Sequence, residues 1–217
     1  MNKIPWVVVT GLDGSGKTTL VNQLEKLFQE QGIRVLKSRS PHDEYLVKTL
    51  LNISGDGQPM KDRYTDRLIF ALDNRILGTR IRHWQASGEY DVILSQRGFF
   101  DSFVHGAVQG YTYQQIAELN GIYDLPVCDI MIHLCADSDI AFSRIKDDDD
   151  ADKFETPAYM RRQEEETRRG YQRLISKDPE LDAFFDAINF FIDTTQLSCD
   201  ETFELAKKRL EPLMPKP

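Results

Sequence analysis

The segment Gly11-Leu12-Asp13-Gly14-Ser15-Gly16-Lys17-Thr18 matches the pattern G-x-x-x-x-G-K-[ST] and directly follows the apolar run Trp6-Val7-Val8-Val9. This pattern predicts a phosphate-binding loop when a strand precedes it and a helix follows. Glycines allow positive φ angles, so that backbone N–H groups can curl around an anion. The positive end of the following helix points at the same spot. A plain glycine-rich turn is the alternative, but the flanking elements favour nucleotide binding.

Each part of this loop has a predicted role in holding a nucleoside triphosphate. Lys17 is expected to reach the β and γ phosphates, and the hydroxyl of Thr18 is expected to ligate Mg²⁺. The predicted nucleotide-binding residues are Gly11, Asp13, Gly14, Ser15, Gly16, Lys17, Thr18 and Thr19.

Strand and helix patterns alternate along the rest of the chain. Apolar runs predict parallel strands at residues 4–10, 33–36, 91–94, 128–134 and 189–193. Helical patterns lie at 17–31, 42–53, 63–87, 138–146 and 156–175, with capping signals for a short helix after Thr112 and a last helix after Ser198. This order predicts a three-layer α/β fold, with a doubly wound, parallel five-stranded sheet of the P-loop NTPase type. We expect one domain over residues 1–217.

The charge of the chain restricts its partners. Its net charge of −8 and pI near 5.1 argue against broad binding to nucleic acid or to acidic membranes. An anionic substrate must therefore meet a local cluster of cations. Three scattered cysteines predict neither a disulfide framework nor a zinc site. The chain reads straight into a strand, with no signal peptide or membrane-spanning run, so we expect a cytoplasmic protein.

Several arginines fall where a doubly wound sheet places its ligands, at the carboxyl ends of the strands. Arg39 follows the second strand, and Gln96-Arg97 follows the third. Arg39 either contacts phosphate or lies in a solvated loop. Of the remaining polar features, His133 falls in a buried strand and is expected to be a satisfied core residue. The acidic run Asp147 to Asp150 predicts a solvated loop, with metal binding as the alternative.

Several segments together resemble thymidylate kinases and related nucleoside monophosphate kinases. The phosphate loop matches that family closely, including Asp13 at its third position. The other similar segments, in chain order, are Arg39-Ser40-Pro41, Leu68-Ile69-Phe70-Ala71 with Asp73-Asn74-Arg75, Gln96-Arg97, Gln109-Gly110, the lid-like stretch from Arg144 to Glu155, Arg168-Arg169-Gly170-Tyr171 and Ile192-Asp193. The family's arginine within the helix predicted at 63–87 is displaced by one place, to Arg75. The family's acid at the end of the third strand is Gln96 here, and Gly98-Phe99 replaces its aromatic-first pattern.

The resemblance implies that ATP, with Mg²⁺, donates a phosphoryl group to a nucleoside monophosphate, most simply dTMP. It also implies a mobile lid at about residues 144–156 and suggests a homodimer. Arg97 would bind the acceptor phosphate, because a planar guanidinium fork meets phosphate oxygens at two points. The predicted acceptor residues are Asp13 at the sugar, Arg39, Phe70, Arg75, Gln96 and Arg97. The predicted catalytic cations are Lys17, Arg97, Arg144 and Lys153. Phe70 and Phe99 either stack on the acceptor base or belong to the core.

Two other functions stay open at this point. A deoxynucleoside kinase would use the same donor site on a bare hydroxyl, and a silent nucleotide-binding module would lack a working acceptor pocket. Convergence of Arg39, Arg75 and Arg97 would favour a phosphorylated acceptor, because an uncharged nucleoside does not need three guanidinium groups. Gln96, in the place of the family acid, keeps the silent module open.

Overall fold

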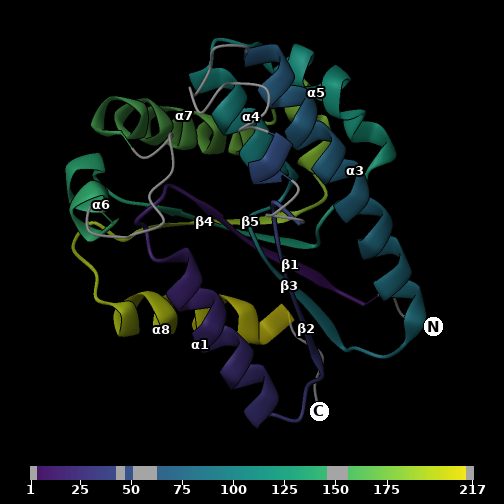
Figure 1. Ribbon diagram of the computed structural model, residues 1–217. Coiled ribbons are helices and arrows are strands. Elements are labelled where there is room, and N and C mark those ends of the chain that lie inside the picture. Colours follow the sequence, from purple (N-terminus) through teal and green to yellow (C-terminus); the bar gives the residue numbers. More distant parts are fainter. Residues whose placement is uncertain (1–3, 43–46, 51–62, 146–155, 214–217) are drawn as a thin grey trace.

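The computed structural model describes residues 4–42, 47–50, 63–145 and 156–213. Its five strands form one parallel sheet with the order β2-β3-β1-β4-β5, and helices cover both faces (Figure 1). The elements are β1 (Trp6–Gly11), α1 (Lys17–Glu30), β2 (Val35–Arg39), α3 (Arg63–Ser87), β3 (Val92–Gln96), α4 (Phe99–Val108), α5 (Tyr113–Asn120), η1 (Ile122–Asp124), β4 (Ile130–Cys135), α6 (Ser138–Ile145), α7 (Pro157–Ile175), η2 (Pro179–Phe184), β5 (Ile188–Asp193), α8 (Cys199–Leu210) and η3 (Glu211–Leu213). The predicted fold class is confirmed.

The two faces of the sheet carry different sets of helices. In Figure 1, α1 and α8 lie below the sheet, whereas α3, α4, α5 and α7 lie above it. Every residue of β1 and β4 is buried, as expected for central parallel strands with both faces covered. The edge strands β2 and β5 are more exposed. Because the strands are parallel, the carboxyl ends of β1, β3 and β4 lie at the same edge of the sheet.

The predicted helix starts are confirmed by their caps. The hydroxyls of Thr112 and Ser198 accept hydrogen bonds from the backbone N–H groups three residues later, at 3.2 Å each, and both helices begin with a capping box. Thr156 caps α7 in the same way, with Pro157 at the first helical position. Of the helix predicted over 42–53, residues 47–50 are helical, His42 is not helical, and residues 43–46 and 51–53 fall outside the described residues.

The sequence does not predict α4. Eight of its ten residues are buried, because it packs between the sheet and the helices α3, α5 and α7. A helix that is apolar nearly all round has no amphipathic period to reveal it. This omission matters for the site, because α4 begins directly after Arg97.

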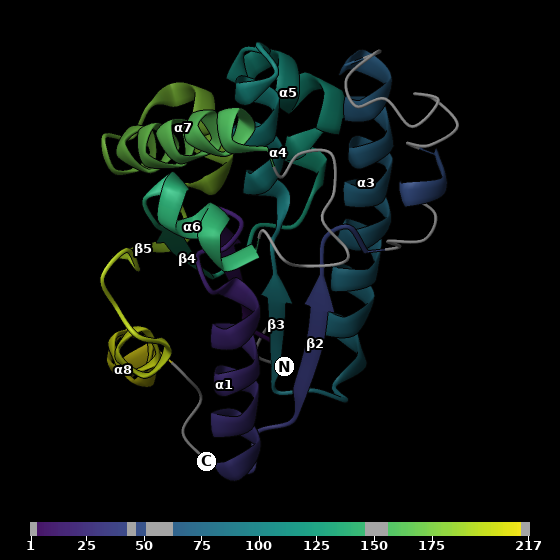
Figure 2. The ribbon, with the colours of Figure 1, turned by 60° about the vertical axis from the view of Figure 1, so that its left-hand side comes forward.

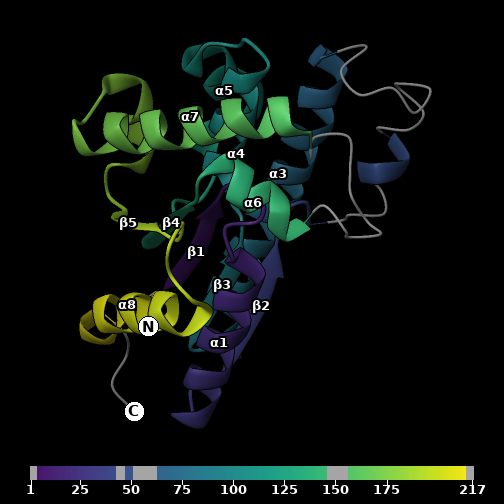
Figure 3. The same cartoon turned by 90° about the vertical axis from the view of Figure 1, so that its left-hand side faces the viewer.

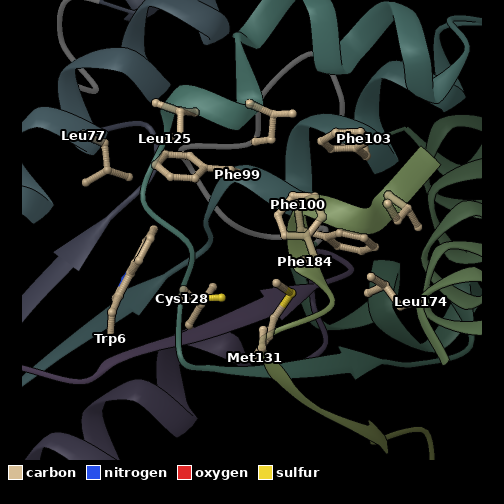
Figure 4. Close-up of a cluster of buried hydrophobic side chains, with 14 of the residues drawn as sticks. Trp6, Leu77, Phe99, Phe100, Phe103, Leu125, Cys128, Met131, Leu174 and Phe184 are labelled. Carbon is tan, nitrogen blue, oxygen red and sulfur yellow. The ribbon is translucent and has the colours of Figure 1, made fainter. Parts of the chain in front are cut away.

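Phe99 belongs to the core on this upper face and not to a base-stacking surface. Its ring meets Trp6 edge to face at 5.3 Å, and Figure 4 shows it among Leu77, Leu125 and Trp6. It is only 4% exposed. Of the two interpretations that the sequence left open for Phe99, the core is therefore correct.

His133 lies in β4 and is fully buried, as predicted. Its Nε2 is 2.9 Å from Oδ1 of Asn189 in β5, while its Nδ1 has no partner among the described residues. The core prediction is thus right for burial, but only one of the two ring nitrogens is satisfied. Burial lowers the pKa of His133 to about 4, against the opposing hydrogen bond to Asn189. Its pKa in the unfolded chain is about 6.5, so the unfolded state binds more protons between these values.

We therefore expect the free energy of unfolding to fall as the pH drops from 6.5 toward 4, with His133 contributing about 2 kcal/mol of loss between pH 7 and pH 5. Urea unfolding at the two pH values measures this. His133→Gln, which keeps an amide donor, should show a smaller loss than the parent. Exposed His83→Gln is the matched control and should match the parent. An equal loss in His133→Gln and the parent would contradict the assignment.

Candidate active site

The phosphate loop connects the end of β1 to the start of α1. Gly11, Gly14 and Gly16 have φ angles of 135°, 74° and 93°, as the loop prediction requires. A Cβ at Gly11 would lie 1.8 Å from the backbone oxygen of Leu134, and one at Gly14 would lie 2.2 Å from that of Ala141. Only glycine fits these two places, because both the backbone angle and the space exclude a side chain. In particular, the loop cannot carry an arginine at position 14 without moving α6.

Lys17 folds its side chain back across the loop. Its Nζ donates to the carbonyl oxygens of Gly11 at 2.9 Å and Leu12 at 2.8 Å, and it pairs with Oδ1 of Asp13 at 3.1 Å. The side chain is almost completely buried. Burial lowers the pKa of the Lys17 ammonium, although Asp13 opposes this effect. The ammonium is thus held beside the loop by protein oxygens, and phosphate oxygens of a bound triphosphate can take their place.

Arg97 stands at the carboxyl end of β3 in an unusual backbone conformation. Its φ of 67° is rare for a residue other than glycine, and its N–H donates to the carbonyl of Val9 at 2.8 Å. The guanidinium pairs with the carboxylate of Asp13 and lies 3.5 Å from Oδ1 of Asp101. Burial alone would raise the pKa of Asp13, but Arg97 and Lys17 hold it well below its usual range. The loop and the end of β3 therefore meet through one carboxylate between two cations.

His105, in α4, completes the surroundings of Arg97. Its Nε2 lies 3.3 Å from Nη1 of Arg97 and 3.4 Å from Nε2 of Gln163, so this ring nitrogen is the acceptor. Its Nδ1 then donates to the hydroxyl of Tyr159, at 2.8 Å. Burial, reinforced by Arg97, lowers the pKa of His105 to about 3. A neutral imidazole therefore accepts from Arg97 throughout the physiological pH range.

A cavity of about 820 Å³ unites these groups in one site, within the size range of small-molecule sites. The phosphate loop lies between its two halves. Figures 2 and 3 show α6 next to the N-terminal end of α1. The segment that connects β5 to α8 lines the same half of the cavity as α6. One half is lined from this side by Arg144, Thr194, Leu197, Ser198 and Thr202. The other half is lined by Arg39, Ser40 and Pro41, by Arg67, Phe70 and Asn74 of α3, and by Asp101, Ser102 and His105 of α4. The site has room for a donor and an acceptor nucleotide on opposite sides of the loop.

Most of the predicted site residues line this cavity. These are Asp13, Gly14, Ser15, Gly16, Lys17, Thr18, Thr19, Arg39, Phe70, Gln96, Arg97 and Arg144. Gly11 does not line it but begins the loop. Lys153, the run Asp147 to Asp150 and most of the lid predicted at 144–156 lie outside the described residues. Arg144 is in the last turn of α6, where it donates to the carbonyl oxygens of Gly14 at 3.2 Å and Thr194 at 3.0 Å.

The expectation that Arg75 converges with Arg97 is wrong. Arg75 does not line the cavity; its Nη1 lies 3.6 Å from the carboxylate of Asp124 and 3.3 Å from the carbonyl of Gly121. The displacement by one place accounts for this, because adjacent residues of a helix point about 100° apart. Asn74 takes the cavity-facing position instead. Its amide nitrogen donates to Ser102 Oγ and to Asn120 Oδ1, at 2.7 Å each.

Gln96 contacts the residue that the loop pattern assigns to the metal. Its Nε2 donates to the hydroxyl of Thr18 at 3.0 Å. The hydroxyl oxygen of Thr18 still has a lone pair free to bind a cation. The amide oxygen of Gln96 is also an oxygen ligand, although an uncharged one, that Mg²⁺ can bind. No cluster of three or more His, Cys, Asp or Glu side chains able to hold a metal occurs within residues 4–42, 47–50, 63–145 and 156–213. The residues present thus fit a cation whose remaining ligands come from phosphates and water.

Arg67, Asn74, Ser102 and His105 are among the cavity residues to which the sequence assigned no role in the site. Arg67, Phe70 and Asn74 have the spacing i, i+3, i+7, which places them on one face of α3. Extending that spacing from Phe70 would have found two of them. Ser102 and His105 had no such signal, because α4 was not recognised.

Within the described part of the chain, no helix has both the length and the apolar character needed to cross a membrane.

Comparisons with known proteins agree with this geometry. The family model described as thymidylate kinase matches residues 9–185. A probable thymidylate kinase of Saccharolobus solfataricus is 31% identical over 143 residues, which cover 65% of this chain and 70% of that protein. A thymidylate kinase of Shouchella clausii is 25% identical, with 93% of this chain and 95% of that protein covered. The solved thymidylate kinase of Candida albicans superposes with a TM-score of 0.69 over 97% of this chain and 92% of that chain, at 15% identity, and so shares the fold. The chain belongs to the thymidylate kinase family and is an ATP-dependent nucleoside monophosphate kinase.

Proposed function

We propose that this kinase transfers the γ-phosphoryl group of ATP to dTMP and so forms dTDP. One observation carries the proposal: a single cavity joins the phosphate loop to the cluster of Asp13, Lys17 and Arg97, with an aromatic wall at Phe70 beyond it. The family supplies the donor, ATP. The relatives named above are thymidylate kinases, which supports dTMP as the acceptor.

The reaction asks the protein mainly for alignment and for compensation of negative charge, because little covalent chemistry is left to its side chains. We assign the donor triphosphate to the loop N–H groups and Lys17. Thr18 would hold Mg²⁺, which would neutralise phosphate charge when bound, and Gln96 would orient the Thr18 hydroxyl. Arg97 would hold the acceptor phosphate in line with the donor. The carboxylate of Asp13 would then weaken its ion pair with Arg97 and accept a hydrogen bond from the acceptor sugar.

The other cations have supporting roles in this proposal. Arg39 lies at the rim of the acceptor half, and Phe70 offers a ring face for the base. Arg144 already touches the carbonyl of Gly14, so it would stabilise the loop itself. Lys153 and closure of a lid at 144–156 stay predictions, as do a single domain over residues 1–217, the homodimer and a cytoplasmic location.

We expect dTMP to give the highest kcat/KM in a panel of nucleoside monophosphates and nucleosides, measured as ADP release from ATP in the presence of Mg²⁺. EDTA should abolish turnover, because charge on the transferring group would then lack its main compensation. Thymidine without a phosphate should give no ADP. Turnover confined to nucleosides would instead identify a deoxynucleoside kinase. ADP release with none of the acceptors would favour a silent nucleotide-binding module.

A further inference from the structure

Arg67 is a buried cation that lines the acceptor half of the cavity, and no residue in the described part of the chain forms an ion pair or a hydrogen bond with it. The residue is 4% exposed, and its Nε has no hydrogen-bond partner. Its guanidinium carbon lies 4.7 Å from the centre of the Phe70 ring. Among the described residues no ion pair within 4.0 Å and no hydrogen bond holds this guanidinium; Tyr159 and then Asp66 make the largest electrostatic interactions with it. Arg67 thus differs from Arg97, which has two carboxylates beside it.

Leaving a buried guanidinium unpaired costs stability, since the charge loses water and gains no oxygen in return. The stacking on Phe70 recovers only a small part of that cost. Burial accordingly lowers the pKa of Arg67, although the group stays charged. Such an arrangement is favourable in a binding site, where the ligand supplies the missing acceptor.

The place of Arg67 in the site indicates which ligand this is. Arg67 shares one face of α3 with Phe70 and Asn74, and His105 of α4 lines the same cavity. All of these residues belong to the acceptor half. A guanidinium has five N–H donors and no acceptor, so its partner must be an oxygen or an acceptor nitrogen. An acceptor nucleotide offers such oxygens on its phosphate and on its base.

We propose that Arg67 is a substrate-binding residue whose guanidinium is completed by an oxygen of the acceptor nucleotide. This inference rests on the proposed function and takes it further. It assigns to Arg67 the role of acceptor-binding arginine in α3, which the sequence had assigned to Arg75. The protein tolerates the unpaired cation because the substrate supplies its counterpart. Arg67 therefore contributes to acceptor affinity and leaves ATP binding unaffected.

The test compares Arg67→Met, which keeps an apolar stem against Phe70, with the parent. We expect the KM for dTMP to rise about tenfold to a hundredfold and the KM for ATP to change less than twofold. The melting temperature without nucleotide should stay equal or rise, and the added stability conferred by dTMP should shrink. Arg75→Met, on the same helix with its side chain 48% exposed, is the matched control and should match the parent.

Calorimetric binding of dTMP and of thymidine separates the two oxygens. If Arg67 binds the phosphate, the substitution weakens dTMP and leaves thymidine unchanged; if it binds a base carbonyl, both weaken by the same factor. A normal KM for dTMP together with a lowered melting temperature would overturn the proposal and make Arg67 a structural residue. Failure of the proposed function would look different, because the parent enzyme itself would then show no turnover of dTMP.

Discussion

Lys17→Ala is expected to lower the turnover number at least ~10²-fold, because the substitution removes a preorganised positive charge at the transferring phosphoryl group. The ammonium already stands on the loop, on the carbonyl oxygens of Gly11 and Leu12. It therefore needs little rearrangement to move onto phosphate oxygens. Steady-state kinetics with saturating dTMP and varied ATP measure the loss, and ATP binding should weaken as well.

The control for Lys17 is Lys26→Ala in the same helix. Lys26 is 79% exposed and forms only a distant pair with Glu30 at 3.9 Å, so turnover should stay at the parent value. The carboxylate of Asp13 keeps its bond to Arg97 after Lys17 is removed, so the fold of the loop should persist. A Lys17→Ala enzyme that works within a few-fold of the parent would rule out this loop as the donor site.

Arg97→Ala is expected to raise the KM for dTMP and to lower kcat, with a combined loss of about 10²-fold or more in kcat/KM and little change in ATP affinity. A guanidinium on the acceptor phosphate acts in both the ground state and the transition state, so both constants should change. The substitution also removes one of the two cations beside Asp13, which keeps its pair with Lys17, and the cation beside Asp101. Kinetics with each substrate varied in turn separate the two effects.

The backbone at Arg97 provides a second variant that isolates the side chain. At a φ of 67°, alanine is strained by about 1–2 kcal/mol, whereas glycine is not. Arg97→Gly and Arg97→Ala should therefore lose activity to the same extent but differ in thermal stability. Activity that returns in the glycine variant would show that the backbone, and not the guanidinium, matters. Lost ATP affinity with intact acceptor binding would move Arg97 to the donor side.

Short-range sequence patterns were enough to predict the strands, the helix caps and the phosphate loop of this protein. The spacing of Gly11, Gly14, Gly16 and Lys17 defines a loop that few backbones can form, and runs such as Val7-Val8-Val9 belong in a covered parallel strand. Caps such as Thr156-Pro157 act on their own helix within four residues. Each of these signals is short in range, so neighbours in the sequence suffice to interpret it.

The composition of the acceptor half, by contrast, depended on contacts between distant segments. Asn74 meets Ser102 and Asn120, and Arg97 meets Asp13, over separations of 28, 46 and 84 residues. Within α3, only the helical spacing from Phe70 separates Arg67, which faces the cavity, from Arg75, which faces Asp124. One residue of displacement along α3 turns a side chain by about 100°. Likewise Phe99 became core only because α4 packs on Trp6.

The amino-acid sequence by itself therefore determined the sheet, the phosphate loop and the kinase family, because these depend on periodicity and on a short motif with its own geometry. Only the tertiary structure decided which cations face the acceptor and which of them are already paired. Arg97 is neutralised by carboxylates from two elements, whereas Arg67 is buried with no ion pair to any carboxylate among the residues that the structure describes. The physical reason is that burial and charge pairing are properties of the space between elements, and that space exists only once α3, α4 and the loop after β1 have packed together.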